Sequence, residues 1–242
     1  MPPADRHFVL GYDPGGNGRH GLAVLQVQQQ QGLWVASHIA ALKALPDVQA
    51  VIACAEACIS SGALVATGID TLTAWSGGPS GWRLADLWLR QRYPSVKNSV
   101  ASPNSLFGSM SIGGSLLLHW LSQRQDHGGV VTEAHPKVCY YALRQELHPW
   151  AKHANPVQRA DGWRWLLHEL GLALPDEALA EDADHGFDAL MGCLAALRGL
   201  NGQWMLDLHQ AGRATEVHPF GRTHYWWPGI KNEGVGLNPL II

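Results

Sequence analysis

The sequence lacks any apolar run long enough to span a membrane. Its first residues, Met1-Pro-Pro-Ala-Asp-Arg6, also lack the charged-then-apolar pattern that marks a signal peptide. We therefore expect a cytoplasmic protein with no membrane association. Hydrophobic residues make up 46% of the 242 positions and charged residues 15%, which is typical of a folded globular chain rather than a disordered one.

The sequence has few cysteines, and none of them forms a Cys-x-x-Cys pair. The four are Cys54, Cys58, Cys139 and Cys193. This spacing excludes a zinc ribbon and a thioredoxin-type redox motif. Cys54 and Cys58 share a helix face, which leaves metal binding as an alternative, but free thiols that pack as small hydrophobic groups are favoured.

An excess of positive charge is also missing, since the formal net charge is −3. Most of the affinity of a protein for nucleic acid comes from cationic contacts to phosphate. A polynucleotide partner would therefore need a local basic patch, or metal ions that offset the acidic residues. Nucleic-acid binding through bulk positive charge is excluded.

Acidic residues stand where apolar runs end. Asp13, Asp70 and Glu133 each close such a run, and Asp184 and Asp188 lie four apart near the start of a late amphipathic segment. Residues at that spacing share one helix face. Strand ends in open α/β sheets face the crevice that holds the ligand. The pattern predicts that these acids converge on one site.

Converging carboxylates repel one another unless a hard cation neutralises them, and Mg²⁺ or Mn²⁺ prefers such oxygen ligands. A structural interpretation stays open for each acid taken singly, because turns favour Asp and Glu at strand ends.

The pattern of apolar residues predicts alternating strands and helices. Strands over residues 8–13, 20–28 and 32–40 are joined by short turns, which require antiparallel neighbours. A helix from Asp47 to about Ser60 leads to the strand that ends at Asp70, and a right-handed crossover lays this strand beside the first. Further helices are predicted over about 82–92 and 114–125, from Pro136, over 155–171 and over 182–198, with a strand ending at Glu133.

The last of these helices carries small residues beside its acids. Gly192 and Ala195 lie on the same strip as Asp184 and Asp188, which would let the helix approach the sheet closely. This favours an inward-facing Asp188. We expect a single domain over residues 1–212. Residues 213–242 form an irregular C-terminal extension, with one candidate short strand near His224-Tyr-Trp-Trp-Pro228.

This order of elements resembles the ribonuclease H-like fold, and more specifically the chain resembles the DUF429 family of predicted nucleases. The resemblance covers residues 8 to about 200 and rests on Gly11-Tyr-Asp-Pro-Gly-Gly16, Gly68-Ile-Asp-Thr-Leu72, Ser102-Pro-Asn104, Thr132-Glu-Ala-His-Pro136 and the stretch 181–190. The chain departs from the family pattern at Asp70-Thr-Leu-Thr73 and in the Gly/Ser-rich loop that follows. The implied fold is α/β, with a mixed five-stranded sheet of order 3-2-1-4-5 flanked by helices on both faces.

The resemblance also implies a two-metal hydrolase site. Asp13 would bridge two Mg²⁺ or Mn²⁺ ions, Asp70 would bind one of them, and Asp188 would complete the cluster. Glu133 and Asp184 would serve as extra ligands or supporting acids. Catalysis is thereby expected from Asp13, Asp70, Glu133 and Asp188, and metal binding from Asp13, Asp70, Asp184 and Asp188.

Substrate contacts are predicted on flanking segments. His135 is a candidate general base or phosphate contact, and a residue that caps or packs against the next helix is the alternative. Arg83 and Arg90 share a helix face and are candidate phosphate contacts, with a solvated helix surface as the alternative. Asn104 could donate to phosphate or form an Asx-turn. His185 lies about 100° around the helix from Asp184, so we expect it to face elsewhere.

Three functions compete. The first is a metal-dependent nuclease or phosphodiesterase acting on nucleic acid, DNA or RNA. The second is a non-catalytic binding module with the same fold, which the acidic net charge supports. The third is an actin-like ATP-binding phosphotransferase, which needs two such domains and is disfavoured by 242 residues without an internal repeat. The sequence leaves the choice between DNA and RNA and the oligomeric state undetermined.

Overall fold

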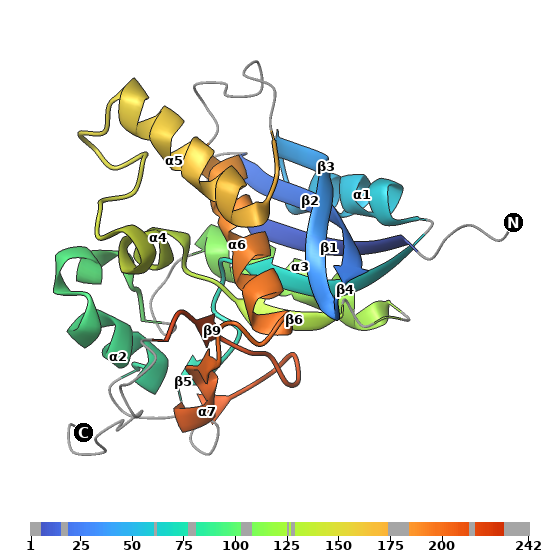
Figure 1. Cartoon of the computed structure of the whole chain (residues 1–242). Helices are drawn as coiled ribbons and strands as arrows, with labels where there is room; N and C mark the ends of the chain where they lie inside the picture. Colours follow the sequence, from blue (N-terminus) through green and yellow to red (C-terminus); the bar gives the residue numbers. More distant parts are fainter. Residues whose placement is uncertain are drawn as a thin grey trace, which may run out of the picture.

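Side chains alternate along the first strand, β1 (Arg6–Asp13), and divide the hydrophobic core into two halves. Val9 packs into one buried cluster, whereas Phe8 and Leu10 pack into another on the opposite face of the sheet. The sheet is therefore covered on both faces, and helices lie in front of it and behind it (Figure 1).

The computed structural model describes residues 6–15, 19–60, 62–76, 81–102, 108–124, 126, 129–173, 184–212 and 216–229. The central sheet has five strands, namely β1, β2 (His20–Gln30), β3 (Leu33–Leu45), β4 (Gly62–Ile69) and β6 (Val130–Glu133). β2 pairs antiparallel with both β1 and β3, while β4 lies parallel to both β1 and β6. The predicted mixed α/β sheet is thus confirmed.

The strand order is β3-β2-β1-β4-β6, which differs from the predicted 3-2-1-4-5. The fifth strand along the chain, β5 (Trp75–Ser76), was not expected, and it leaves the central sheet to pair with β8 (Glu216–Val217). The edge position is taken instead by β6. Two-residue strands carry no alternation of side chains, so the sequence pattern could not reveal β5.

Helices cover the two faces of the sheet unequally. One face carries α6 (Asp184–Leu200), which packs directly on β1, β2 and β4, together with α5 (Pro156–Leu170), α4 (Pro136–Arg144), α2 (Leu84–Arg92) and the 3₁₀-helix η1 (Pro94–Ser99). The other face carries α1 (Val48–Ile59) and α3 (Gly108–Gln123). Figure 1 shows α5 and α6 in front of the strands, with α1 and α3 behind.

The predicted helix ends agree with the observed ones where capping residues mark them. The Asp47 carboxylate accepts a hydrogen bond from Ala50 N at 2.8 Å and begins α1. Asn155 and Gln158 form a reciprocal capping box at the start of α5. Gly171 ends α5 with φ of 68°, a left-handed conformation that favours glycine.

The segment after α6 packs against the free side of β6. It contains β7 (Leu206–Asp207), α7 (His209–Gly212), β8 and β9 (Trp226–Trp227), and β7 pairs antiparallel with β9. His224 forms a parallel bridge with Thr132, so this segment extends the sheet beyond β6. Tyr225 and Trp227 are buried in the core. Residues 216–229 therefore pack on the domain, and their two short strands hold them there.

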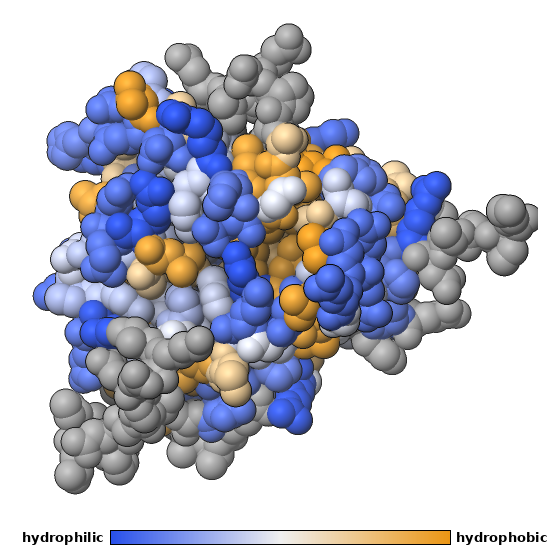
Figure 2. All heavy atoms as spheres, in the orientation of Figure 1, coloured by the Kyte–Doolittle hydropathy of each residue, from blue (hydrophilic) through white to orange (hydrophobic). Residues whose placement is uncertain are grey.

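The face of the molecule seen in Figure 2 is largely hydrophilic. In the orientation of Figure 1, Figure 2 shows hydrophobic residues in a band where α6 meets β2 and β3, with hydrophilic residues on either side. Within the described ranges, no helix combines the length and the apolar content needed to cross a membrane.

Candidate acidic site

Asp13 and Asp70 meet at one edge of the sheet because β1 and β4 run parallel. Tyr12 is the partner of Ile69 in the register, so the residues that follow them lie side by side. The backbone N–H of Asp70 donates to the carbonyl of Tyr12 at 2.9 Å, which holds the two strand ends together. Asp13 is 7% exposed. The predicted convergence of these two acids at the strand ends is confirmed.

Asp188 reaches the same edge because α6 lies on the strands backbone to backbone. A Cβ atom added at Gly11 would fall 1.8 Å from the Ala189 carbonyl oxygen. One added at Gly68 would fall 1.9 Å from the carbonyl oxygen of Gly192. The prediction that small residues bring this helix close to the sheet is confirmed, and Asp188 is buried and faces inward.

These three carboxylates, Asp13, Asp70 and Asp188, form what we call the acid cluster, and each affects the ionisation of the others. Burial raises the pKa of Asp13 to about 6, with the His185 hydrogen bond lowering it and the charge of Asp188 raising it. Burial also raises the pKa of Asp70 well above its ordinary value, and the charges of Asp13 and Asp188 raise it further. The cluster therefore disfavours full ionisation and would be stabilised by a positive charge.

Two histidines contact different members of the acid cluster. Nδ1 of His185 lies 2.5 Å from Oδ2 of Asp13, and Nε2 of His148 lies 2.7 Å from Oδ1 of Asp188. Burial raises the pKa of Asp188, but His148 and the nearby cations outweigh burial, so its pKa lies below the ordinary value.

The prediction that His185 faces elsewhere is wrong. The first turn of α6 lies over the start of β2, and a Cβ added at Gly21 would fall 1.9 Å from the His185 carbonyl oxygen. His185 thus contacts Asp13 at the end of β1, and its Nε2 also lies 4.0 Å from Oδ1 of Asp184. The prediction used only the angle between His185 and Asp184 around the helix. That angle does not reveal which strand of the sheet lies beneath the first turn of α6.

Lys137, in the first turn of α4, is a cation at this site that the sequence analysis missed. Burial lowers the pKa of its ammonium group, but Asp188, Asp70 and Asp13 raise it more strongly, and the net pKa is raised. The residue itself is exposed to solvent. Its position four residues after Glu133, in a helix that begins at the same sheet edge, was the available signal.

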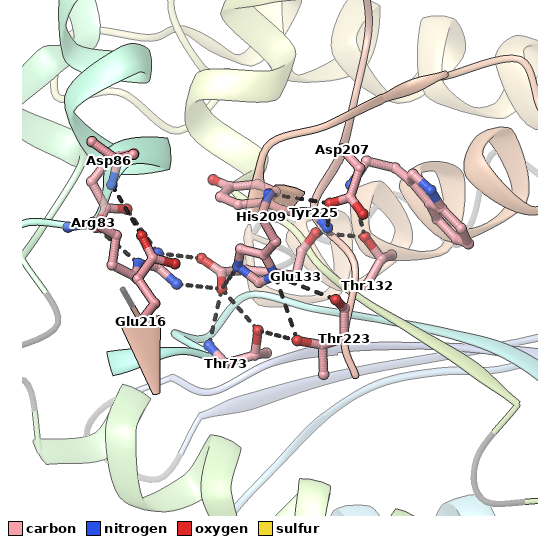
Figure 3. A network of polar contacts seen from close by, with 12 residues as sticks. Thr73, Arg83, Asp86, Thr132, Glu133, Asp207, His209, Glu216, Thr223 and Tyr225 are labelled. Atoms are coloured by element: carbon pink, nitrogen blue, oxygen red, sulfur yellow. Dashed lines mark hydrogen bonds and ion pairs between the residues drawn. The ribbon is translucent and has the colours of Figure 1, made fainter. Parts of the chain in front are cut away.

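Glu133 was expected to be an extra ligand or a supporting acid, and its oxygens are bound by other residues, although its charge helps to raise the pKa of Asp70. Arg83 donates to both oxygens, from Nη1 to Oε2 at 2.7 Å and from Nη2 to Oε1 at 2.6 Å. Thr73 N–H donates to Oε2 as well, at 2.9 Å (Figure 3). The charge of Arg83 outweighs burial and leaves the pKa of Glu133 well below its ordinary value. Both carboxylate oxygens of Glu133 are therefore engaged in hydrogen bonds within the protein.

The two arginines expected to contact phosphate are both engaged within the protein. Arg83 is buried just before α2, where it also binds Asp86 (Figure 3). Arg90 donates to the carbonyls of Lys97 and Val100, at 2.7 and 3.1 Å, and so holds η1. The expected shared helix face fails because Arg83 precedes the helix and turns into the core.

Asn104, Asp184 and His135 complete the set of predicted site residues. Asn104 lies outside the described residues. Asp184 is half-buried, and its Oδ1 accepts from the His185 N–H at 2.9 Å. Burial lowers the pKa of His135 to about 4, and its Nδ1 has no hydrogen-bond partner in the described part of the chain. His135 and Asp70 line a cavity of about 20 Å³, which has room for one water molecule.

The donor chemistry of the acid cluster fits Mg²⁺ or Mn²⁺, since it offers buried carboxylate oxygens with excess negative charge. The side chains are not arranged as a finished coordination sphere. Among the described residues, no group of three or more His, Cys, Asp or Glu side chains is placed to hold a metal ion. Asp13 and Asp188 instead accept hydrogen bonds from histidines.

Comparison with protein-family models, curated proteins and solved structures finds no match for this chain.

Proposed function

We propose that this chain is a metal-dependent nuclease or phosphodiesterase that hydrolyses phosphodiester bonds of nucleic acid. The observation that carries the proposal is the acid cluster, in which three distant segments bring Asp13, Asp70 and Asp188 to one sheet edge. Burying three carboxylates together costs free energy, and a cation site is one arrangement that offsets this cost. We further propose the ribonuclease H-like fold and membership in the DUF429 family.

In this proposal, Asp13, Asp70 and Asp188 would hold Mg²⁺ or Mn²⁺, with Asp184 as an additional ligand. When bound, such ions activate a water molecule and stabilise the leaving oxygen of a phosphodiester. Lys137 would contact a phosphate oxygen, because it brings an exposed positive charge to the acid cluster. It provides a local positive charge in a chain whose formal net charge is −3.

A binding module is the second candidate, and one observation favours it. The histidine contacts to Asp13 and Asp188 satisfy two of the three acids without any metal. Such a protein would keep the fold and the buried polar groups without binding divalent ions. The two candidates differ in their response to Mn²⁺.

Titration of the full chain with Mn²⁺, followed by electron paramagnetic resonance, tests the proposal. We expect saturable binding together with Mn²⁺-dependent cleavage of labelled DNA or RNA. Both should be lost in Asp13→Asn. Glu146→Gln, which removes an exposed carboxylate, is the matched control and should behave as the unmodified chain. Unchanged Mn²⁺ affinity and cleavage in Asp13→Asn would contradict the nuclease proposal. No Mn²⁺ binding to the unmodified chain would favour the binding module.

A further inference from the structure

His148 lies in the connection between α4 and α5, 40 residues before the acid that it contacts. Its Nε2 is 2.7 Å from Oδ1 of Asp188, and the residue is only 5% exposed. Aromatic rings surround it, with centroids of Tyr140, Trp150 and Phe187 at 5.9, 5.9 and 5.4 Å from the imidazole. The ring is therefore held in one place by packing, independently of the carboxylate.

The hydrogen bonds of this imidazole define which nitrogen carries the proton. The backbone N–H of Trp150 donates to Nδ1 at 3.4 Å, so Nδ1 acts as an acceptor. In a neutral imidazole the other nitrogen then carries the hydrogen. Nε2–H is thus the donor to Asp188, and the contact does not require a charged histidine.

The two histidines at the acid cluster differ in how firmly they are held. The side chain of His185 is 22% exposed, whereas that of His148 is 5% exposed and enclosed by aromatic rings. His185 can turn towards solvent when the Asp13 carboxylate takes another partner. His148 is enclosed by neighbouring rings, so its contact to Asp188 is the more firmly held of the two.

We propose that His148 is a positioning residue, which holds Oδ1 of Asp188 through Nε2–H and so directs the second carboxylate oxygen towards a divalent cation. In the described part of the chain, that second oxygen receives no hydrogen bond. A carboxylate already held in one rotamer loses less side-chain entropy when it binds an ion. Loss of such a supporting partner costs about 10- to 100-fold in metal affinity. This inference rests on the proposed function.

The first test compares Mn²⁺ affinity among variants of the full chain. His148→Leu removes the donor and fills the site with an apolar side chain of moderate size, and we expect Mn²⁺ affinity to fall by about 10- to 100-fold. His148→Gln places an amide N–H near the position of Nε2 and should restore affinity to within a few-fold. His153→Leu changes an exposed histidine of the same connection and is the control. Far-ultraviolet circular dichroism and thermal melting report whether each variant folds.

The outcomes separate this inference from the proposed function. Absence of Mn²⁺ binding to the unmodified chain would overturn both. Binding to the unmodified chain, with equal binding to a folded His148→Leu, would overturn only the role of His148. Weaker binding in His148→Leu that His148→Gln does not restore would also contradict a role as hydrogen-bond donor.

A second measurement needs no variant. Nitrogen-15 NMR of the histidine rings, recorded with and without saturating Mg²⁺, reports the tautomer of His148 directly. We expect the neutral Nε2–H form in both states, with its hydrogen bond to Asp188 retained. An Nδ1–H tautomer, or loss of the Nε2 hydrogen when Mg²⁺ binds, would show that His148 is a ligand or an acceptor and would overturn the proposal.

Discussion

Arg83 and Glu133 form a two-point ion pair in the protein interior, with side chains 0% and 3% exposed. Fifty residues separate them in the sequence. The pair joins the start of α2 to the end of β6 (Figure 3). Glu133 lines the same small cavity as Asp70 of the acid cluster. His209 adds a contact to Oε2 of Glu133 at 3.4 Å from the segment that follows α6. Three parts of the chain therefore depend on one buried carboxylate.

Removing either partner of this pair should be strongly destabilising. We expect Arg83→Met to lower the free energy of unfolding by about 3–5 kcal/mol, because it leaves Glu133 charged and buried. Urea denaturation measures the change. Lys152→Met, which removes one positive charge at an exposed position, is the matched control. The double variant Arg83→Met/Glu133→Leu should lose less than the sum of the two single changes. Additive losses would argue against a coupled pair.

The glycine contacts of α6 should make the sheet intolerant of a methyl group at Gly68. Its Cβ would lie 1.9 Å from the Gly192 carbonyl oxygen, so helix and strand must separate. We expect Gly68→Ala to destabilise the fold by about 1–3 kcal/mol. It should also weaken Mn²⁺ binding, because Asp188 moves with the helix. Gly186→Ala, on the same helix, meets only the flexible end of Leu42 at 3.4 Å and should be tolerated. Equal stability of the two variants would contradict this interpretation of the contact.

Asp207 should make stability depend on acid pH. Burial raises its pKa, but the His224 hydrogen bond and the Tyr225 N–H lower it more, to about 2 against an ordinary value of 3.8. As pH falls below about 4, the unfolded chain binds the proton first, so this contribution of roughly 2 kcal/mol decreases and is lost below the folded pKa. Between pH 5 and pH 3, urea denaturation should show a smaller pH dependence for Asp207→Asn than for the unmodified chain. Parallel profiles would count against the assignment.

The four thiols should fall into two classes of reactivity. Cys54 and Cys58 are half-buried on α1, whereas Cys139 and Cys193 are 3% and 0% exposed. Burial raises the pKa of the two buried thiols and also that of Cys58, so access of the reagent is what separates the two classes. We expect Ellman's reagent to modify two thiols quickly in the native protein and four after denaturation. Cys54→Ser/Cys58→Ser should abolish the fast phase, and a fast phase that persists would show that the interior opens.

Local sequence signals predicted the main elements well, whereas contacts between distant segments escaped them. Asp13 and Asp70 could be placed together because each ends an apolar run, and parallel strands end at one edge. The Arg83–Glu133 and His148–Asp188 contacts join residues 50 and 40 apart, and no periodicity encodes either pairing. An arginine before a helix has the same local pattern whether it faces solvent or turns into the core. The inward turn of Arg83 is a property of the tertiary fold.

The segment around His224 has a consequence for how this protein could associate with other chains. By pairing with β6 at Thr132, it occupies one border of the sheet. In the described residues, the opposite border is β3, a thirteen-residue strand whose pairing with β2 shifts register twice. Such irregularities bend a strand and discourage extension by another chain. Any peptide that joins this sheet as an added strand would have to do so along β3, at the border remote from β6.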